Sequence, residues 1–253
     1  MASSPSDASE PCVIACLGSS STQGKGQAFN WIAELELRLK SGPRQFVFHN
    51  FGVGGDLAYN ALQRVPKLIA CRPNKVVVFI GGNDALAMAS SKAGRFFRFF
   101  NRLPRAPSPV WFEENLRAIV TTLRNGSSAA IALCSLPPMG EDPHSANPFQ
   151  SDLNRSIGNF SAIIKKVAAE EGVNYIPLHE EFTAQIAQEP GQALTAFNFL
   201  PFYRDAFRAF VLHKSPDEIA RLNGWKFHTD GVHLNRRGGL IVAGHVQIFI
   251  ERN

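Results

Sequence analysis

The chain has 253 residues, enough for one large α/β domain or two small ones. Hydrophobic residues make up 45% of it and charged residues 19%, a composition typical of a globular protein with ample material for a core. The net charge of +5 comes from scattered Lys and Arg and not from a dense basic stripe, so we predict no nucleic-acid partner.

The N-terminal residues 1–11 are rich in Ser, Asp and Glu and lack the apolar core of a secretion signal. We therefore expect a disordered tail, followed by one domain over residues 12–253. No apolar run is long enough to span a bilayer. Four cysteines lie in or beside apolar runs without metal-ligand spacing, at Cys12, Cys16, Cys71 and Cys134. We expect them to be buried free thiols, which places the protein in the cytoplasm or another reducing intracellular compartment.

Apolar runs and helical patterns alternate five times along the chain. The runs predict strands at residues 12–17, 45–50, 75–80, 129–134 and 173–178. The helical patterns predict helices at residues 29–40, 57–70, 111–125, 151–171 and 237–251, the second of them disturbed by its proline. This alternation predicts a three-layer α/β/α sandwich with a five-stranded parallel sheet.

Two aromatic segments do not fit the alternation. Residues 94–102 combine four phenylalanines with three arginines. Residues 199–212 form an apolar helical stripe with Arg204, Asp205 and Arg208 opposite it, and the stripe consists of Phe199, Phe202, Tyr203, Phe207, Phe210 and Val211. Three interpretations stay open: core packing, a roof over an acyl site, and weak contact with an anionic membrane surface. After these segments, Ser215 begins a short helix as its N-cap.

Glycines and hydrogen-bonding residues follow three of the predicted strands where each strand ends. Ser20 lies in a Gly-Ser-Ser-Ser turn after the first strand, Gly55 in a glycine-rich loop after the second, and Asn83 in a Gly-Gly-Asn-Asp loop after the third. Because the carboxyl ends of parallel strands meet at one edge of a sheet, we expect these three loops to converge there.

Near the end of the chain, Asp230 precedes His233 by three residues, with Gly231 between them. Gly231 permits a turn that brings the carboxylate to the Nδ1–H of His233, which leaves Nε2 free to accept a proton from a serine. Nucleophile, base, orienting carboxylate and hydrogen-bond donors are the parts of an acyl-transfer site. The chemistry alone leaves open which of the serines at 19–21 is the nucleophile.

These motifs resemble those of the SGNH subgroup of the GDSL esterases and lipases. The matching blocks are residues 18–24, 50–56, 81–84 and 230–233, in the order of the family. The resemblance implies Ser20 as the nucleophile, with His233 and Asp230 completing the triad. It also implies an oxyanion hole made by the N–H groups of Ser20 and Gly55 and by the Asn83 side chain.

The same resemblance implies a flavodoxin-like SGNH hydrolase fold, here with aromatic-rich insertions at the catalytic edge. The implied activity is hydrolysis of a small-molecule carboxylic ester or lipid through an acyl-enzyme, without a metal or organic cofactor. We favour a hydrophobic acyl group, because 20 Phe stand against 3 Trp and 3 Tyr. The alternatives are a carbohydrate O-acetyl esterase or acyltransferase, and a non-catalytic acyl-binding protein. Oligomeric state stays open.

One residue departs from the family pattern: Ser19 stands where the family has aspartate. We expect this difference to lie outside the residues that react, because Ser19 can still hydrogen-bond within the loop. No spacing joins the other histidines to the site, and we expect them at the surface or with satisfied hydrogen bonds; they include His144, His179, His213, His228 and His245.

Overall fold

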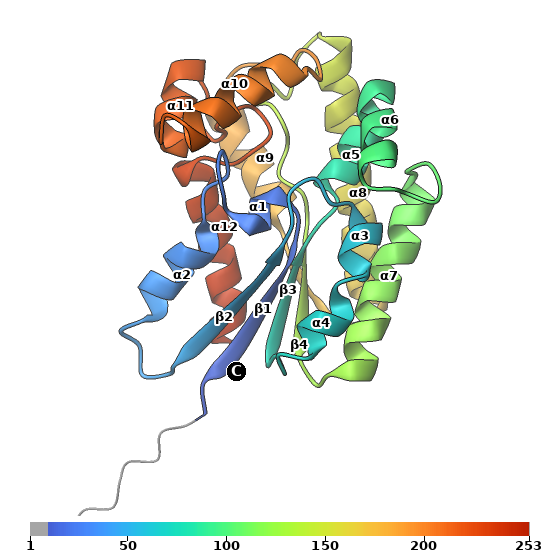
Figure 1. Ribbon diagram of the computed structural model, residues 1–253, viewed down its shortest axis with the longest axis vertical. Coiled ribbons are helices and arrows are strands. Elements are labelled where there is room, and N and C mark those ends of the chain that lie inside the picture. The colour runs from blue at the N-terminus through green and yellow to red at the C-terminus, as the bar shows by residue number, and fades with distance from the viewer. Residues whose placement is uncertain (1–9, 253) are drawn as a thin grey trace, which may run out of the picture.

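The computed structural model describes residues 10–252, so residues 1–9 of the predicted tail lie outside the described part. A five-stranded, fully parallel sheet forms its centre, with strand order β2-β1-β3-β4-β5 (Figure 1). The strands are β1 (Cys12–Gly18), β2 (Phe46–Gly52), β3 (Lys75–Phe79), β4 (Ala130–Cys134) and β5 (Asn174–Ile176). The order is flavodoxin-like and reverses between β1 and β3, and ligands bind outside the carboxyl ends of strands at such a point.

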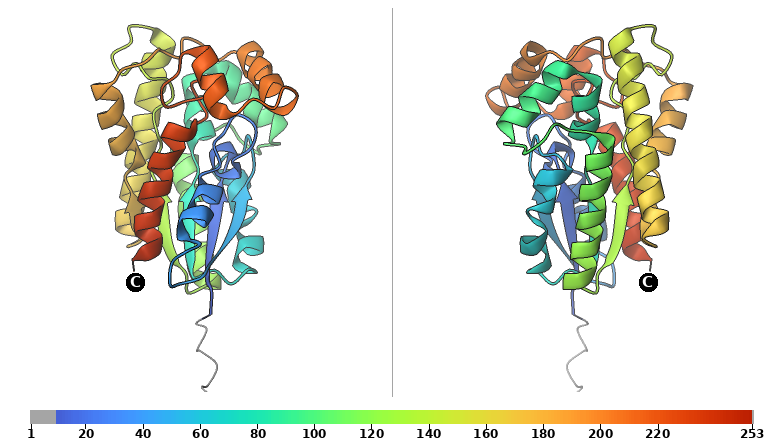
Figure 2. Two further views of the ribbon diagram at one scale, coloured as in Figure 1. Left: turned by 90° about the vertical axis from the view of Figure 1, so that its left-hand side faces the viewer. Right: turned by 90° about the vertical axis from the view of Figure 1, so that its right-hand side faces the viewer.

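Helices cover both faces of the sheet, as predicted. Figure 2 shows α2 and α12 in front of one face and α7 and α8 in front of the other. These helices and the neighbouring α9 are α2 (Trp31–Leu39), α7 (Pro109–Gly126), α8 (Pro148–Glu170), α9 (Leu178–Gln188) and α12 (Arg236–Glu251). Every residue of β3 is buried, because a parallel strand between two helical layers has no solvent face. The predicted α/β/α sandwich is therefore confirmed.

The shorter helices lie around the carboxyl edge of the sheet or connect the layers. They are α1 (Ser20–Gln23), α3 (Ala58–Leu62), α4 (Val65–Ile69), α5 (Gly82–Ala89), α6 (Ser91–Phe100), α10 (Phe199–Phe210) and α11 (Pro216–Asn223). The single helix predicted over residues 57–70 is wrong, since the chain forms α3 and α4 there. Pro66 lies in the first turn of α4, where a backbone N–H would have no partner within the helix, so proline is tolerated there. The Ser215 cap of α11 is present, with Glu218 completing a capping box.

The four cysteines are free; Cys12, Cys16 and Cys134 are buried, whereas Cys71 is only partly buried. Between residues 10 and 252, none of the helices combines the length and the apolar character needed to cross a bilayer. The intracellular location and the single domain over residues 12–253 stay predictions.

Candidate active site

The turn after β1 presents Ser20 at the carboxyl edge of the sheet. Only glycine fits at Gly18, because a Cβ there would lie 2.0 Å from Thr22 Oγ1 and 2.4 Å from the Phe79 carbonyl oxygen. The chain then turns directly into α1, whose first residue is Ser20. The Ser19 carbonyl accepts hydrogen bonds from two α1 amides at 3.2 and 2.9 Å. The strand and the short helix together fix the direction of the Ser20 side chain.

Side chains from neighbouring elements hold this turn. Asn50 Nδ2 donates to the Thr22 carbonyl at 2.9 Å, and Trp31 Nε1 donates to the Ser21 carbonyl at 2.9 Å. The Ser19 side chain, in contrast, makes no capping hydrogen bond to α1, and only its carbonyl bonds within the loop. The expected hydrogen bonding of Ser19 within the loop is therefore made by its backbone and not by its hydroxyl. Asn50 and Trp31 stabilise the turn instead.

The loop at residues 230–233 brings His233 to Ser20, 213 positions away in sequence. Nε2 of His233 lies 3.1 Å from Ser20 Oγ, and its Nδ1 lies 2.8 Å from Asp230 Oδ2. The other carboxylate oxygen of Asp230 accepts the backbone N–H groups of Val232 at 3.0 Å and His233 at 2.8 Å. Gly231 has φ 86°, so the turn expected there is present. His233 thus lies within hydrogen-bonding range of both other predicted triad residues.

The side chains of His233 and Asp230 are almost fully buried, and each changes the protonation of the other. Burial disfavours the charged form of His233, but the adjacent Asp230 carboxylate outweighs burial and raises the pKa of His233 above its usual value. Burial likewise disfavours the Asp230 carboxylate, but His233 and two backbone N–H groups outweigh it and lower the pKa of Asp230. At neutral pH the carboxylate is ionised and makes the imidazole a stronger base.

Gly55 and Asn83 lie on the two loops beside the Ser20 turn. Gly55 has φ 83°, a left-handed conformation that glycine adopts without strain. A Cβ built on the preceding Gly54 would lie 3.9 Å from Ser20 Cβ, so this loop passes directly along the serine. Asn83 is buried in the first turn of α5, and its Nδ2 donates to the Asp56 carbonyl at 2.9 Å. The amide keeps a second N–H, as an oxyanion donor requires.

Sequence comparison decides the family of the chain. A sequence model of the GDSL-like lipase/acylhydrolase family matches residues 16–238, which include all four predicted motif blocks. The chain belongs to this family. The predicted membership of the GDSL family is thereby confirmed.

Known proteins similar to this GDSL-family chain agree with the assignment. A GDSL esterase/lipase of Arabidopsis thaliana is 26% identical to this chain over 202 residues. These residues make up 78% of this chain and 62% of that protein, so the chain spans less than two thirds of its relative's length. An acetyl xylan esterase, AlAXEase, has a TM-score of 0.66 at 20% identity, over 94% of this chain and 99% of its own. The acetylxylan esterase Axe2 of Geobacillus stearothermophilus has a TM-score of 0.65 at 15% identity, over 97% of this chain and 96% of its own. At such identities the two structures show a shared fold.

One arginine that the sequence did not single out joins the loops of the GDSL-family site. Arg64, between α3 and α4, forms an ion pair with Asp56. Its Nη2 donates to the Gly18 carbonyl at 3.0 Å and to the Phe51 carbonyl at 3.2 Å. A single guanidinium therefore connects the ends of β1 and β2 to the loop that carries the predicted oxyanion donor. Nothing in the pattern around Arg64 distinguished it from an ordinary helix residue.

Two further side chains hold the loop at Gly55 and Asn83. Asn101 Nδ2 donates to the Gly55 carbonyl at 2.8 Å. Asp84 Oδ2 accepts the backbone N–H of Ala58 at 3.1 Å, and burial raises the pKa of Asp84 to about 7. These contacts orient the Gly55 peptide and the start of α5.

A buried ion pair fixes the chain just before the Asp230–His233 loop. His228 Nδ1 lies 2.9 Å from Glu141 Oε1, and its Nε2 lies 2.9 Å from the Pro138 carbonyl oxygen. A carbonyl cannot donate, and Glu141 Oε1 also accepts the N–H groups of Phe227 at 2.6 Å and His228 at 2.9 Å. Both ring nitrogens of His228 therefore face oxygen acceptors. Burial disfavours the Glu141 carboxylate, but His228 and the backbone N–H groups outweigh it and lower the pKa of Glu141.

The expectation of a histidine with satisfied hydrogen bonds thus holds for His228. The sequence did not reveal where His228 lies. Its side chain is fully buried beside the Asp230–His233 loop and contacts Glu141, which is 87 residues away in the chain. No local spacing connects residues so far apart.

The aromatic stripe of α10 does not pack into the core. Phe207 and Phe210 are exposed, as are most other described members, and the side chain of Phe199 lies outside the described part. The core-packing interpretation is therefore wrong for this segment. Phe202 lies over the predicted base, with its ring centroid 6.0 Å from that of His233, and Gln27 Nε2 donates to the Phe202 carbonyl at 2.9 Å. That the aromatic segments are insertions stays a prediction.

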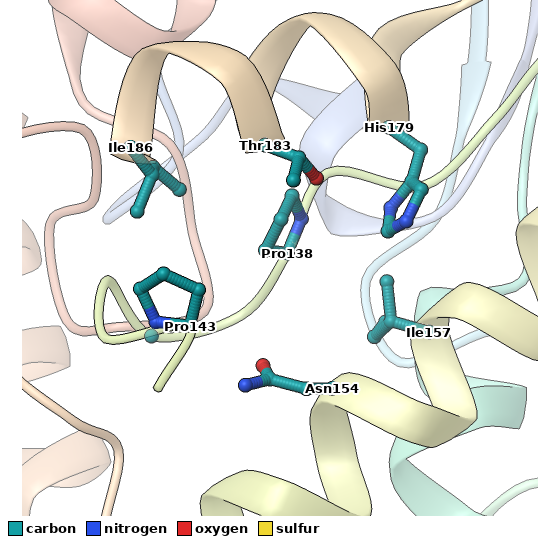
Figure 3. A pocket seen from close by; sticks show the side chains of 8 residues that line it. Pro138, Pro143, Asn154, Ile157, His179, Thr183 and Ile186 are labelled. Atoms are coloured by element: carbon teal, nitrogen blue, oxygen red, sulfur yellow. The ribbon is translucent and has the colours of Figure 1, made fainter. Parts of the chain in front are cut away.

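Two cavities lie near the loop after β4. A hollow of about 30 Å³ adjoins the Ser20 turn, and its lining includes Ser19, Ser21, Met139, Val232 and Leu234. A second cavity, of about 160 Å³, lies between this loop, α8 and α9 and contains none of the predicted site residues (Figure 3). The lining of the first contains none of them either, but it includes both chain neighbours of Ser20, namely Ser19 and Ser21. No group of three potential metal ligands occurs within residues 10–252.

Proposed function

We propose that this chain hydrolyses carboxylic esters by a two-step serine mechanism, with Ser20 as nucleophile, His233 as base and Asp230 as the residue that orients it. The observation that carries the proposal is the unbroken chain of contacts from Ser20 Oγ to His233 Nε2 at 3.1 Å and from His233 Nδ1 to Asp230 Oδ2 at 2.8 Å. Nucleophilic serines are activated by this arrangement of base and orienting carboxylate.

In the first step, His233 takes the proton of Ser20 as Oγ forms a bond to the ester carbonyl carbon. The negative charge that develops on the carbonyl oxygen is held by the N–H groups of Ser20 and Gly55 and by the Asn83 side chain. Collapse of the tetrahedral intermediate transfers the His233 proton to the leaving alcohol and leaves an acyl-enzyme. In the second step, water loses a proton to His233 as its oxygen attacks the acyl carbon. The bond between that carbon and Ser20 Oγ then breaks, His233 returns the proton to Oγ, and the acid is released.

We further propose that the substrate carries a hydrophobic acyl group. Phe202 over His233 and the apolar side chains around the small hollow offer an apolar surface next to the serine. The hollow, at about 30 Å³, accepts one or two carbon-sized groups. A longer acyl chain extends out of it beneath Phe202.

The second candidate is an O-acetyl esterase acting on a carbohydrate. The small hollow suits an acetyl methyl group, and the two structurally similar proteins AlAXEase and Axe2 are acetyl xylan esterases. The aromatic residues favour the first candidate, because Trp and Tyr, with a polar group beside an apolar ring, suit a sugar better than Phe. Here Trp31 and Trp111 are buried and Trp225 packs against His228.

The deciding experiment measures kcat/KM for p-nitrophenyl esters of two to twelve carbons and acetate release from acetylated xylan. The proposal expects hydrolysis that rises with chain length beyond acetate and falls about a millionfold in Ser20→Ala. A higher kcat/KM on acetylated xylan than on any longer acyl ester would instead establish the second candidate. Acyl esters that bind without turnover would identify a binding protein.

A further inference from the structure

Helix α10 presents its apolar face to solvent and its polar face to the protein. Asp205 is 1% exposed at its side chain and accepts hydrogen bonds from Arg208 Nη1 at 2.8 Å and Asn223 Nδ2 at 2.7 Å. Asn223 Nδ2 also donates to the Thr229 carbonyl at 3.1 Å, next to Asp230 of the proposed triad. An amphipathic helix in a globular protein normally buries its apolar side, so the orientation of α10 is the reverse of the usual one.

The outer face of α10 is accordingly apolar and largely exposed. Leu200 is 75% exposed, Phe210 60% and Phe207 53%. Helix α6 adds Phe99, 88% exposed, and Phe100, 66% exposed. Both helices lie at the same end of the molecule, beyond the carboxyl edge of the sheet, in every view (Figures 1 and 2). Exposed large apolar side chains concentrated at one end of a protein mark an interaction surface.

The charges beside these rings show what kind of partner this surface fits. Arg95, Arg98 and Arg102 line an open hollow of about 630 Å³ together with Phe99 and Phe100. Within residues 10–252, no acidic side chain pairs with any of the three arginines. From residue 85 to residue 112 the chain carries five basic residues and no acidic one. The partner must therefore offer apolar groups and negative charge together.

We propose that α6 and the outer face of α10 form a docking surface for an anionic lipid bilayer. Helices that lie in a membrane interface expose an apolar face flanked by Lys and Arg, which pair with anionic headgroups while the rings enter the acyl boundary. A second copy of the chain fits less well, because pairing this face with itself would oppose the unpaired arginines of both copies. The proposal concerns binding and does not depend on the proposed ester hydrolysis.

Vesicle co-sedimentation tests the proposal with the full chain. Phosphatidylcholine vesicles containing 30% phosphatidylserine should bind the protein in low salt, pure phosphatidylcholine vesicles should bind it at least tenfold more weakly, and 0.5 M salt should weaken binding to the anionic vesicles. Arg95→Gln with Arg98→Gln should reduce partitioning roughly 30-fold. Phe99→Ser with Phe100→Ser should reduce it at least tenfold.

Matched variants on other faces serve as controls. Leu37→Ser with Ile248→Ser removes exposed apolar side chains from α2 and α12, and Arg155→Gln removes an exposed charge from α8. These should leave partitioning unchanged, and every variant should keep the unfolding temperature of the wild type. Equal binding to both vesicle types, or undiminished binding of both α6 variants, would overturn the proposal. Concentration-dependent dimerisation without vesicle binding would overturn it as well and assign the surface to a second copy.

Discussion

Replacing Glu141 by glutamine should destabilise the protein far more than a surface substitution. The fully buried carboxylate accepts the His228 Nδ1–H at 2.9 Å and the backbone N–H groups of Lys226 at 2.9 Å, Phe227 at 2.6 Å and His228 at 2.9 Å. Glutamine keeps the shape but loses the charge and turns one acceptor into a donor, which leaves the buried His228 ring and the three backbone N–H groups with one acceptor fewer.

Breaking a buried ion pair by removing one partner costs about 3–5 kcal/mol. Because Glu141→Gln keeps one acceptor oxygen, we expect the lower end, about 3 kcal/mol. For a chain of this size that corresponds to a decrease in Tm of about 6–12 °C. The same substitution should lower kcat, since the pair anchors the strand-like segment that leads into Asp230 and His233.

Urea unfolding, thermal unfolding and steady-state kinetics measure these effects. The matched control is Glu189→Gln, because this exposed carboxylate pairs with Arg237 and Lys226 nearby, and its loss should leave stability and kcat unchanged. If Glu141→Gln unfolds at the same urea concentration as the wild type and retains full kcat, the buried pair does not anchor the loop and the reasoning fails.

Other substitutions test individual parts of the site. Asn83→Ala should lower kcat about 100- to 1000-fold with little change in the circular dichroism spectrum, and an unchanged kcat would remove it from the oxyanion hole. In a pH profile, kcat/KM should fall on the acid side as His233 becomes protonated. Because the Asp230 carboxylate raises the pKa of His233, Asp230→Asn should move this limb to lower pH and reduce kcat about 10⁴-fold, and an unmoved limb would contradict the pairing. Gly231→Ala should destabilise the protein by about 2–4 kcal/mol, since φ is 86° and the new Cβ would lie 2.7 Å from an indole ring. Gly244→Ala, in open space on α12, should not destabilise it.

The fold was predictable because its signals are local. Buried parallel strands read as short apolar runs, and all five were found within a few residues of their observed ends, although the last is only Asn174–Ile176. Helix α5 was missed because Gly81 and Gly82 are typical of a loop, whereas Gly81 in fact serves as the N-cap at φ 121°. Helix α9 was missed as well. The break within residues 57–70 was anticipated only as a disturbance by the proline, and Pro66 does lie in the first turn of the second helix, α4.

The predicted site residues Ser20, Asp230 and His233 could be named because each lies in a short motif. The residues that hold them could not, because Glu141, His228 and Arg64 act through partners distant in sequence and none has a distinctive neighbourhood. The orientation of α10 was equally hidden. A helical stripe has the same pattern whether it faces inward or outward, and here the buried Asp205 network decides the direction.

The account depends most on Ser20 being the residue that attacks the substrate. Reaction of the protein with a fluorophosphonate, followed by peptide mass spectrometry, measures this directly. We predict stoichiometric modification of Ser20, loss of labelling in Ser20→Ala and His233→Ala, and unchanged labelling in Ser21→Ala. Modification of another serine, or labelling of Ser20→Ala at the rate of the wild type, would contradict the central claim.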